Sequence, residues 1–249
     1  MIISDETIVL GSMKHSESNK IVTLFSKNHG KIRVIAKGAR KQSSALGASL
    51  EILTISESVI YYKTHGALHL LSKSSMLYSM YSLHTVYEKL LLGMVFVEIL
   101  LLWLPEEAPN EELFLLSKEY FLALNDSEVD KSFVVYIIAM IKFFDCIGFA
   151  IHLNGLLLDE VKLFKDCSYC YNSLNDSIEE ITEETQNCFA LSHTAVQLLS
   201  MCSQLQFEGI SGGITAPKEN ICKELHNFFV HYIRSHFHRH VKLQTELFV

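Results

Sequence analysis

Short runs of β-branched and large apolar residues, separated by turn residues, fill the first 76 positions of the chain. A glycine between the second and third runs, at residues 28–30, suits a tight connection that needs a positive φ. Five short strands with no long helix between them predict a small closed barrel, and a barrel of this size is commonly an OB-fold. The five runs are residues 7–11, 20–25, 31–36, 51–62 and 68–73.

After residue 76 the apolar residues recur at spacings of three and four, which indicates α-helices. Pro105 ends the first predicted helix, Asn110 and Ser192 are suited to cap two others, and Pro217 opens the last. The fold class predicted is therefore α+β. It comprises an OB-fold domain at residues 1–76 and an α-helical domain at 77–249, with a cysteine-containing insertion near 165–190. The helices are expected at residues 77–104, 111–124, 131–147, 192–206 and 217–240.

The most apolar segment is residues 90–104, in which Glu98 is the only charged side chain. A membrane span needs about 20 apolar residues, so this segment is interpreted as a core helix. Phe96 and Trp103 lie seven positions apart and are expected to be buried anchors on one side of it. The first six residues have no basic and apolar signal-peptide pattern, so we expect a cytoplasmic protein with no membrane partner.

The net charge of −7 conceals an uneven distribution. Residues 1–80 contain ten Lys and Arg against five Asp and Glu, a net +5, which leaves −12 for the other 169 residues. Clustered cations attract polyanions such as nucleic acids, whereas the alternative is an uneven scatter of solvated surface charge. The densest basic cluster, residues 37–44, also contains small residues that would let a phosphate backbone approach it. The candidate DNA-binding residues are Lys31, Arg33, Lys37, Arg40 and Lys41, of which the first three share one parity along the chain.

Residues 17–41 read ESNKIVTLFSKNHGKIRVIAKGARK, which resembles the N-terminal signature of the bacterial DNA repair protein RecO family. The match includes the Gly30-Lys31 step and the Lys-Gly-Ala-Arg sequence of residues 37–40. Weaker similarities in the helical region extend the resemblance over essentially the whole chain. It implies an OB-fold followed by a helical domain, in agreement with the pattern above.

The resemblance also implies a function. Members of the family bind single- and double-stranded DNA and anneal complementary strands in the RecF pathway of recombination. They act with RecR on single-strand-binding protein so that RecA can load. Nucleic-acid binding is indicated independently by the basic cluster, whereas these partners, and association with the nucleoid, follow from the resemblance alone.

The sequence has no P-loop, dinucleotide fingerprint or nucleophile elbow, so it is interpreted as a protein that is not an enzyme. A second hypothesis is a protein–protein adaptor whose acidic helical body is the main functional surface. DNA binding with a steep salt dependence would favour the mediator, and an absence of DNA binding would favour the adaptor.

Cys167 and Cys170 form a C-x-x-C where many members of the family begin a four-cysteine zinc site. The second pair is missing here: Cys188 alone lies at the right distance, and His193 is the remaining candidate for a fourth ligand. We therefore expect a degenerate site at Cys167, Cys170 and Cys188, and a protein that folds without zinc or another cofactor.

Histidines recur near the C-terminus, where His236 and His240 are four positions apart. Two histidines at this spacing on a helix can bind a metal ion, but no carboxylate lies between them as in zinc peptidases. A weakly basic polar face at the end of a helix is the expected role.

Overall fold

The computed structural model describes residues 1–42, 44, 46–63, 68–153, 169–181, 188–211 and 215–237. The chain forms two compact units, residues 1–126 and residues 127–249, and each is described here by itself. The first unit contains the strands predicted from the sequence together with three helices, so it extends beyond the expected domain boundary at residues 76 and 77. That boundary stays a prediction.

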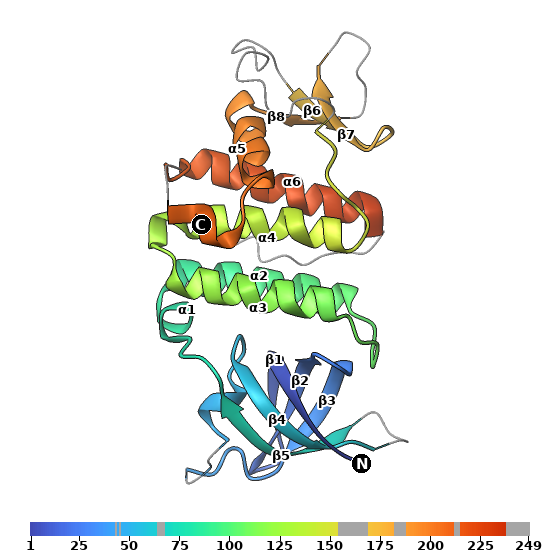
Figure 1. Ribbon diagram of the computed structural model, residues 1–249, viewed down its shortest axis with the longest axis vertical. Helices are drawn as coiled ribbons and strands as arrows, with labels where there is room; N and C mark the ends of the chain where they lie inside the picture. The colour runs from blue at the N-terminus through green and yellow to red at the C-terminus, as the bar shows by residue number, and fades with distance from the viewer. Residues whose placement is uncertain are drawn as a thin grey trace. The chain divides into compact units, whose positions relative to one another are not determined.

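The first unit is built on a closed five-stranded barrel with the strand order β1-β2-β3-β5-β4 (Figure 1). All neighbouring strands are antiparallel except β3 and β5, which pair in parallel and close the barrel. The predicted OB-like barrel is therefore confirmed. The strands are β1 (Ile2–His15), β2 (Asn19–Ser26), β3 (Gly30–Ala36), β4 (Ile55–Tyr61) and β5 (His69–Met76).

Two strands, β1 and β4, differ most from the prediction. β1 is much longer than residues 7–11, because its first half pairs with β4 and its second half with β2, with an irregularity between Val9 and Gly11. Its start was missed because it contains polar residues, whose side chains find partners only in the fold, as Ser4 does with Glu57 and Asp5 with Asn28. Conversely, residues 51–54 precede β4: Leu53 has a φ of 72° and its N–H donates to the Val9 carbonyl.

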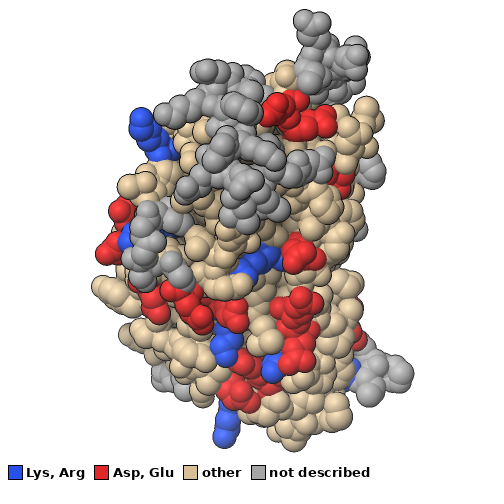
Figure 2. Space-filling view, turned by 45° about the horizontal axis from the view of Figure 1, so that its top comes forward, with Lys and Arg blue, Asp and Glu red and all other residues tan. Residues whose placement is uncertain are grey.

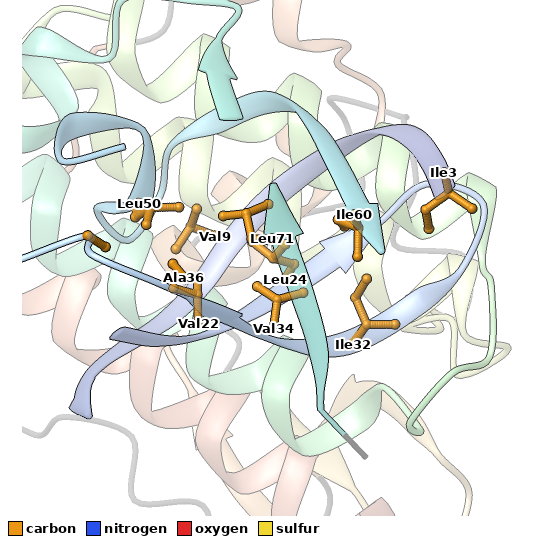
Figure 3. Packing of buried hydrophobic residues seen from close by; sticks show 11 residues of the cluster. Ile3, Val9, Val22, Leu24, Ile32, Val34, Ala36, Leu50, Ile60 and Leu71 are labelled. Carbon is orange, nitrogen blue, oxygen red and sulfur yellow. The ribbon is translucent and has the colours of Figure 1, made fainter. Parts of the chain in front are cut away.

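Alternate side chains of the strands point into the barrel and form its core (Figure 3). Val22 and Leu24 on β2 face Ile32 and Val34 on β3, and all four are buried. Burying an aliphatic side chain of this size contributes about 1.5–3 kcal/mol, so the period-two pattern fixes which face of each strand points inward.

Three helices complete the first unit: α1 (Tyr81–Thr85), α2 (Tyr87–Trp103) and α3 (Glu111–Asp126). The prediction of one helix over residues 77–104 was wrong, because Val86 is extended and separates α1 from α2. Continuous apolar composition does not reveal such a break. Phe96 is fully buried against Tyr120 and Phe121 of α3, as expected, whereas Trp103, the last residue of α2, is only half-buried.

The helices pack on the barrel through close contacts. The rings of Phe25 on β2 and Phe114 on α3 meet edge to face, with 5.3 Å between their centroids. Gly30, at the start of β3, has a φ of +70°, and a Cβ there would lie 2.1 Å from the Ala108 carbonyl oxygen. The α2–α3 connection therefore lies directly against the barrel, and no residue with a side chain fits at position 30 beneath it.

A buried lysine links the three helices. Lys89 of α2 donates hydrogen bonds of 2.8 Å to the Ser82 hydroxyl and to the Asn125 carbonyl near the end of α3. Burial lowers the pKa of Lys89. Because the ammonium is hydrogen-bonded to α1 and to the C-terminal end of α3, it stabilises their packing on α2.

The second unit packs α4 (Ser132–Cys146), α5 (His193–Ser203) and α6 (Glu219–Phe237) with a three-stranded sheet of order β7-β6-β8. Its strands are β6 (Tyr169–Asn172), β7 (Ser177–Glu180) and β8 (Cys188–Leu191). The cap predicted at Ser192 is present, since its hydroxyl accepts a hydrogen bond from the Ala195 N–H. In the part of the chain that is described, no helix is both long and apolar enough to cross a membrane. Short 3-10 helices are η1 (Ala48–Leu50), η2 (Val129–Lys131) and η3 (Phe207–Ser211).

Candidate nucleic-acid interface

The basic turn, residues 37–42, follows β3 and is held by its backbone. Gly38 has a φ of +69°, and its N–H donates to Asn19 Oδ1 over 3.0 Å. The Lys41 N–H donates to the Gly38 carbonyl, and the side chain of Ala39 is buried in the barrel core. Because the main chain and Ala39 anchor the turn, the long side chains around them are left to project from the surface.

Arg40 joins the basic turn to the turn between β1 and β2. Its N–H donates to the Ser18 carbonyl over 3.0 Å, and its Nη1 donates to the Ser16 carbonyl over 2.7 Å. Lys37, Arg40 and Lys41 are all exposed. The structure thus brings three of the five predicted DNA-binding residues together on one hydrogen-bonded turn at this end of the barrel.

Arg33 and Lys31 have different surroundings although both lie on the outer side of β3. Arg33 is exposed and stands opposite Thr23 of β2. The Lys31 side chain is only 12% exposed, and its Nζ lies 3.3 Å from Glu106 Oε1 and 3.3 Å from the Leu101 carbonyl oxygen. The end of α2 and the connection after it cover Lys31, so it does not join the other four cations.

Carboxylates neutralise one group of barrel lysines and leave another exposed. Lys20, Lys27 and Lys31 form ion pairs with Glu51, Glu111 and Glu106 at 3.0–3.3 Å. Within the described residues, no such ion pair is made by Lys14, Arg33, Lys37, Arg40 or Lys41. These five cations, which we call the open cations, are therefore the ones best placed to meet phosphates.

The open cations do not give the first unit a net positive charge. The first unit as a whole contains twelve Lys and Arg against thirteen Asp and Glu, because its helices are acidic. On the face shown in Figure 2, acidic side chains cover more of the surface than basic ones, and no broad basic patch is visible. A polyanion would thus be drawn to the open cations, not to the molecule in general.

The other end of β3 carries a cluster of hydrogen-bonded polar groups that the sequence did not reveal. The buried Asp5 carboxylate accepts hydrogen bonds from the Asn28 N–H at 2.9 Å and from Asn28 Nδ2 at 2.7 Å, and it also contacts Ser26 and His29. Burial raises the pKa of Asp5, but these hydrogen bonds outweigh it and hold the pKa below its usual value. The carboxylate therefore fixes the turn between β2 and β3.

His69 belongs to the same end and is fully buried. Its ring stacks on Tyr62 with 4.0 Å between centroids, its Nδ1 accepts from the Lys63 N–H, and its Nε2 lies 3.3 Å from Glu107 Oε1. Burial lowers the pKa of His69 despite the nearby Glu107 carboxylate. In a neutral ring with its proton on Nε2, Nδ1 accepts from Lys63 and Nε2 faces Glu107, although that contact falls short of hydrogen-bond geometry. The ring thus packs against the α2–α3 connection.

Of the three candidate zinc ligands in the second unit, Cys170 and Cys188 are described, whereas Cys167 lies outside the described residues. Cys170 on β6 and Cys188 on β8 share one face of the sheet. Burial, together with the neighbouring Cys188 and Glu179, raises the pKa of Cys170 to about 12. No cluster of three metal-binding side chains occurs where the structure is described, and zinc-independent folding stays a prediction.

His236 packs within the second unit, whereas His240 lies outside the described residues. The Nε2 of His236 is 3.1 Å from Asp176 Oδ1 and 3.1 Å from the Tyr171 hydroxyl. The ring therefore attaches the β6–β7 hairpin to α6.

Curated proteins similar to this chain share one name. It is 34% identical over 127 residues to the DNA repair protein RecO of Salinibacter ruber, covering 51% of this chain and 49% of that protein. It is 36% identical over 157 residues to the same-named protein of Bacillus velezensis, covering 62% and 59%. With that of Bacillus pumilus, 28% identity extends over 244 residues, 93% of this chain and 90% of the relative. The first two matches thus span only about half and three fifths of those relatives.

Two family models account for almost all of the sequence. Residues 1–80 match "Recombination protein O N terminal" and residues 84–244 match "Recombination protein O C terminal". The resemblance noted in residues 17–41 is thereby confirmed, and the chain belongs to the RecO family.

Proposed function

We propose that this protein is a recombination mediator in DNA repair, which binds single- and double-stranded DNA without sequence specificity and anneals complementary strands. Its membership in the RecO family and the name of its relatives support the role in repair. The observation that carries the DNA-binding part is the group of open cations around the basic turn, which have no carboxylate partner among the described residues.

Binding of this kind rests on phosphates. Lys and Arg side chains replace the counterions condensed on DNA, and the released ions make affinity fall steeply with salt. Phosphate contacts position a strand without reading its bases, which suits a protein that must accept any sequence. Bringing two complementary strands to one cationic surface reduces their mutual repulsion and so favours base pairing. Annealing makes and breaks no covalent bond, so it requires no catalytic residue.

The partners proposed are RecR and single-strand-binding protein, with loading of RecA as the outcome. These proposals rest on the family. A DNA-binding protein of this kind would act in the cytoplasm, at the nucleoid. No zinc ion or other cofactor is part of the proposal.

A titration of single-stranded DNA binding against salt tests the proposal. The variant K37A/R40A/K41A removes three open cations, and K131A/K218A/K223A removes the same charge from the second unit as a matched control. The first variant should bind about tenfold more weakly or worse, and the log–log salt slope should flatten by about 0.7 for each phosphate that the variant no longer neutralises.

Equal binding by the two variants would contradict the proposed interface. An absence of DNA binding by the unaltered protein would instead favour the adaptor hypothesis. The second unit carries nine Lys and Arg against fifteen Asp and Glu, which is the surface an adaptor would use.

A further inference from the structure

A mostly apolar groove of about 790 Å³ lies in the first unit. One side is formed by η1 and the residues that lead from it into β4, and the other by the β5–α1–α2 segment. Ile52, Leu77 and Met94 are among the apolar residues that line it. In Figure 1 the η1 segment and the β5–α1 connection lie on the same side of the barrel. Apolar surface left open in this way generally marks a binding site.

Two tyrosines line the groove and remain accessible. Tyr81, at the start of α1, is 75% exposed, and Tyr78 is 37% exposed. The Nζ of Lys118 lies 5.1 Å from the centre of the Tyr78 ring and 2.8 Å from Glu6 Oε1, so this ring lies beside an ion pair. Exposed aromatic rings are the surfaces on which unpaired bases stack.

The groove adjoins the basic turn. Glu51 lines the groove and forms a 3.0 Å ion pair with Lys20 on β2. Lys20 stands opposite Ala36, the residue immediately before Lys37. The chain also runs from the basic turn into Ala48, another lining residue. The apolar groove and the basic turn are therefore linked through Lys20 at one end of the barrel.

We propose that this groove receives the bases of single-stranded DNA, with Tyr81 and Tyr78 as stacking surfaces, while the open cations hold the phosphates. The inference rests on the proposed function and extends it. The adjoining cations favour a polyanion over an apolar peptide as the occupant. Duplex DNA keeps its bases stacked inside the helix, so it would use the cations and leave the groove empty. The groove would thus distinguish single strands from duplexes.

The test compares Tyr81→Ala with Tyr81→Phe and with Tyr87→Ala in the full chain. Tyr87 is 63% exposed and lies on α2 outside the groove lining, so it is a matched control. Binding of an oligo-dT strand and of a mixed-sequence duplex is measured over a range of salt concentrations. Tyr81→Ala should weaken single-strand binding about tenfold, with duplex binding and the salt slope unchanged, because stacking involves no counterion release. Tyr81→Phe and Tyr87→Ala should bind as the unaltered protein does.

Single-strand affinity that is unchanged in Tyr81→Ala would overturn the inference, and so would an equal reduction for the strand and the duplex. An unchanged affinity of Tyr81→Ala for DNA, together with a weakened affinity for an apolar peptide, would assign the groove to a protein partner instead. The proposed function fails separately, through an unchanged affinity of K37A/R40A/K41A. Melting temperatures of all variants show whether each is folded, and substituting the exposed Tyr81 is not expected to alter them.

Discussion

The lysines at the two ends of β3 differ in exposure and in ion pairing. At the start of the strand, Lys31 is covered by the α2–α3 connection and paired with Glu106. Just beyond its end, Lys37 and Lys41 are exposed and have no carboxylate partner among the described residues. The comparison shows that a count of basic residues overstates the charge available to a ligand, because folding brings acidic helices onto part of the barrel. We call these the covered end and the open end.

The largest expected effect is the loss of stability when the glycine at each end is replaced by alanine. Gly30 and Gly38 have φ values of +70° and +69°, so alanine is strained at both. At the open end, a Cβ on Gly38 meets only the flexible Lys41 side chain at 3.7 Å, whereas at Gly30 it would overlap the Ala108 backbone. Gly38→Ala should cost about 1–2 kcal/mol. Gly30→Ala should lower the free energy of unfolding considerably more, since the whole connection must move.

Urea unfolding of the two glycine variants measures this difference directly. Equal destabilisation would mean that the α2–α3 connection does not pack against the start of β3, and the distinction between a covered and an open end would be wrong.

The ends should also respond differently to pH. The pKa of His69 in the fold is lowered from 6.5, mainly by burial. As the pH falls below about 6.5, the unfolded chain therefore takes up a proton that the folded chain does not, and stability declines. His69→Gln should remove this part of the acid sensitivity, with the exposed His15→Gln as its control.

Unfolding free energies at pH 7.5 and 5.5 provide the measurement. The decline between these pH values should be smaller in His69→Gln than in either the unaltered protein or His15→Gln. A decline of the same size in all three would show that His69 is not held neutral.

The smallest effect concerns zinc, which should change nothing. Protein purified without a chelator should contain no stoichiometric zinc, and Cys167→Ser should leave its melting temperature unchanged. One equivalent of bound zinc that disappears in that variant, together with a lower melting temperature, would show a metal site in the second unit.

The barrel could be predicted because its core residues alternate with a period of two. This alternation is visible in the sequence of each strand, whichever strands it pairs with. The helical region was predicted from its apolar spacing, and the Ser192 cap was identified correctly. The break at Val86 could not be predicted, because its neighbours are apolar on both sides and only tertiary packing selects the extended conformation there.

The composition of the interface was predictable only in part. The basic turn is contiguous in sequence, so its cations could be identified together. The neutralisation of Lys31 depends on Glu106, 75 positions further along the chain, and no local pattern relates the two. The contact of Arg40 with the β1–β2 turn and the burial of Ala39 likewise arise only when the barrel closes.

A comparison of Lys31→Ala with Lys37→Ala shows whether DNA distinguishes the covered lysine of β3 from the exposed one. Both substitutions remove one lysine adjoining β3, and the structure predicts that only the second matters for DNA. We measure the dissociation constant for an oligo-dT strand across a salt series. Lys37→Ala should weaken binding and flatten the salt slope by about 0.7, whereas Lys31→Ala should bind with unaltered affinity and slope. An equal weakening in the two variants, or a weakening confined to Lys31→Ala, would contradict the account.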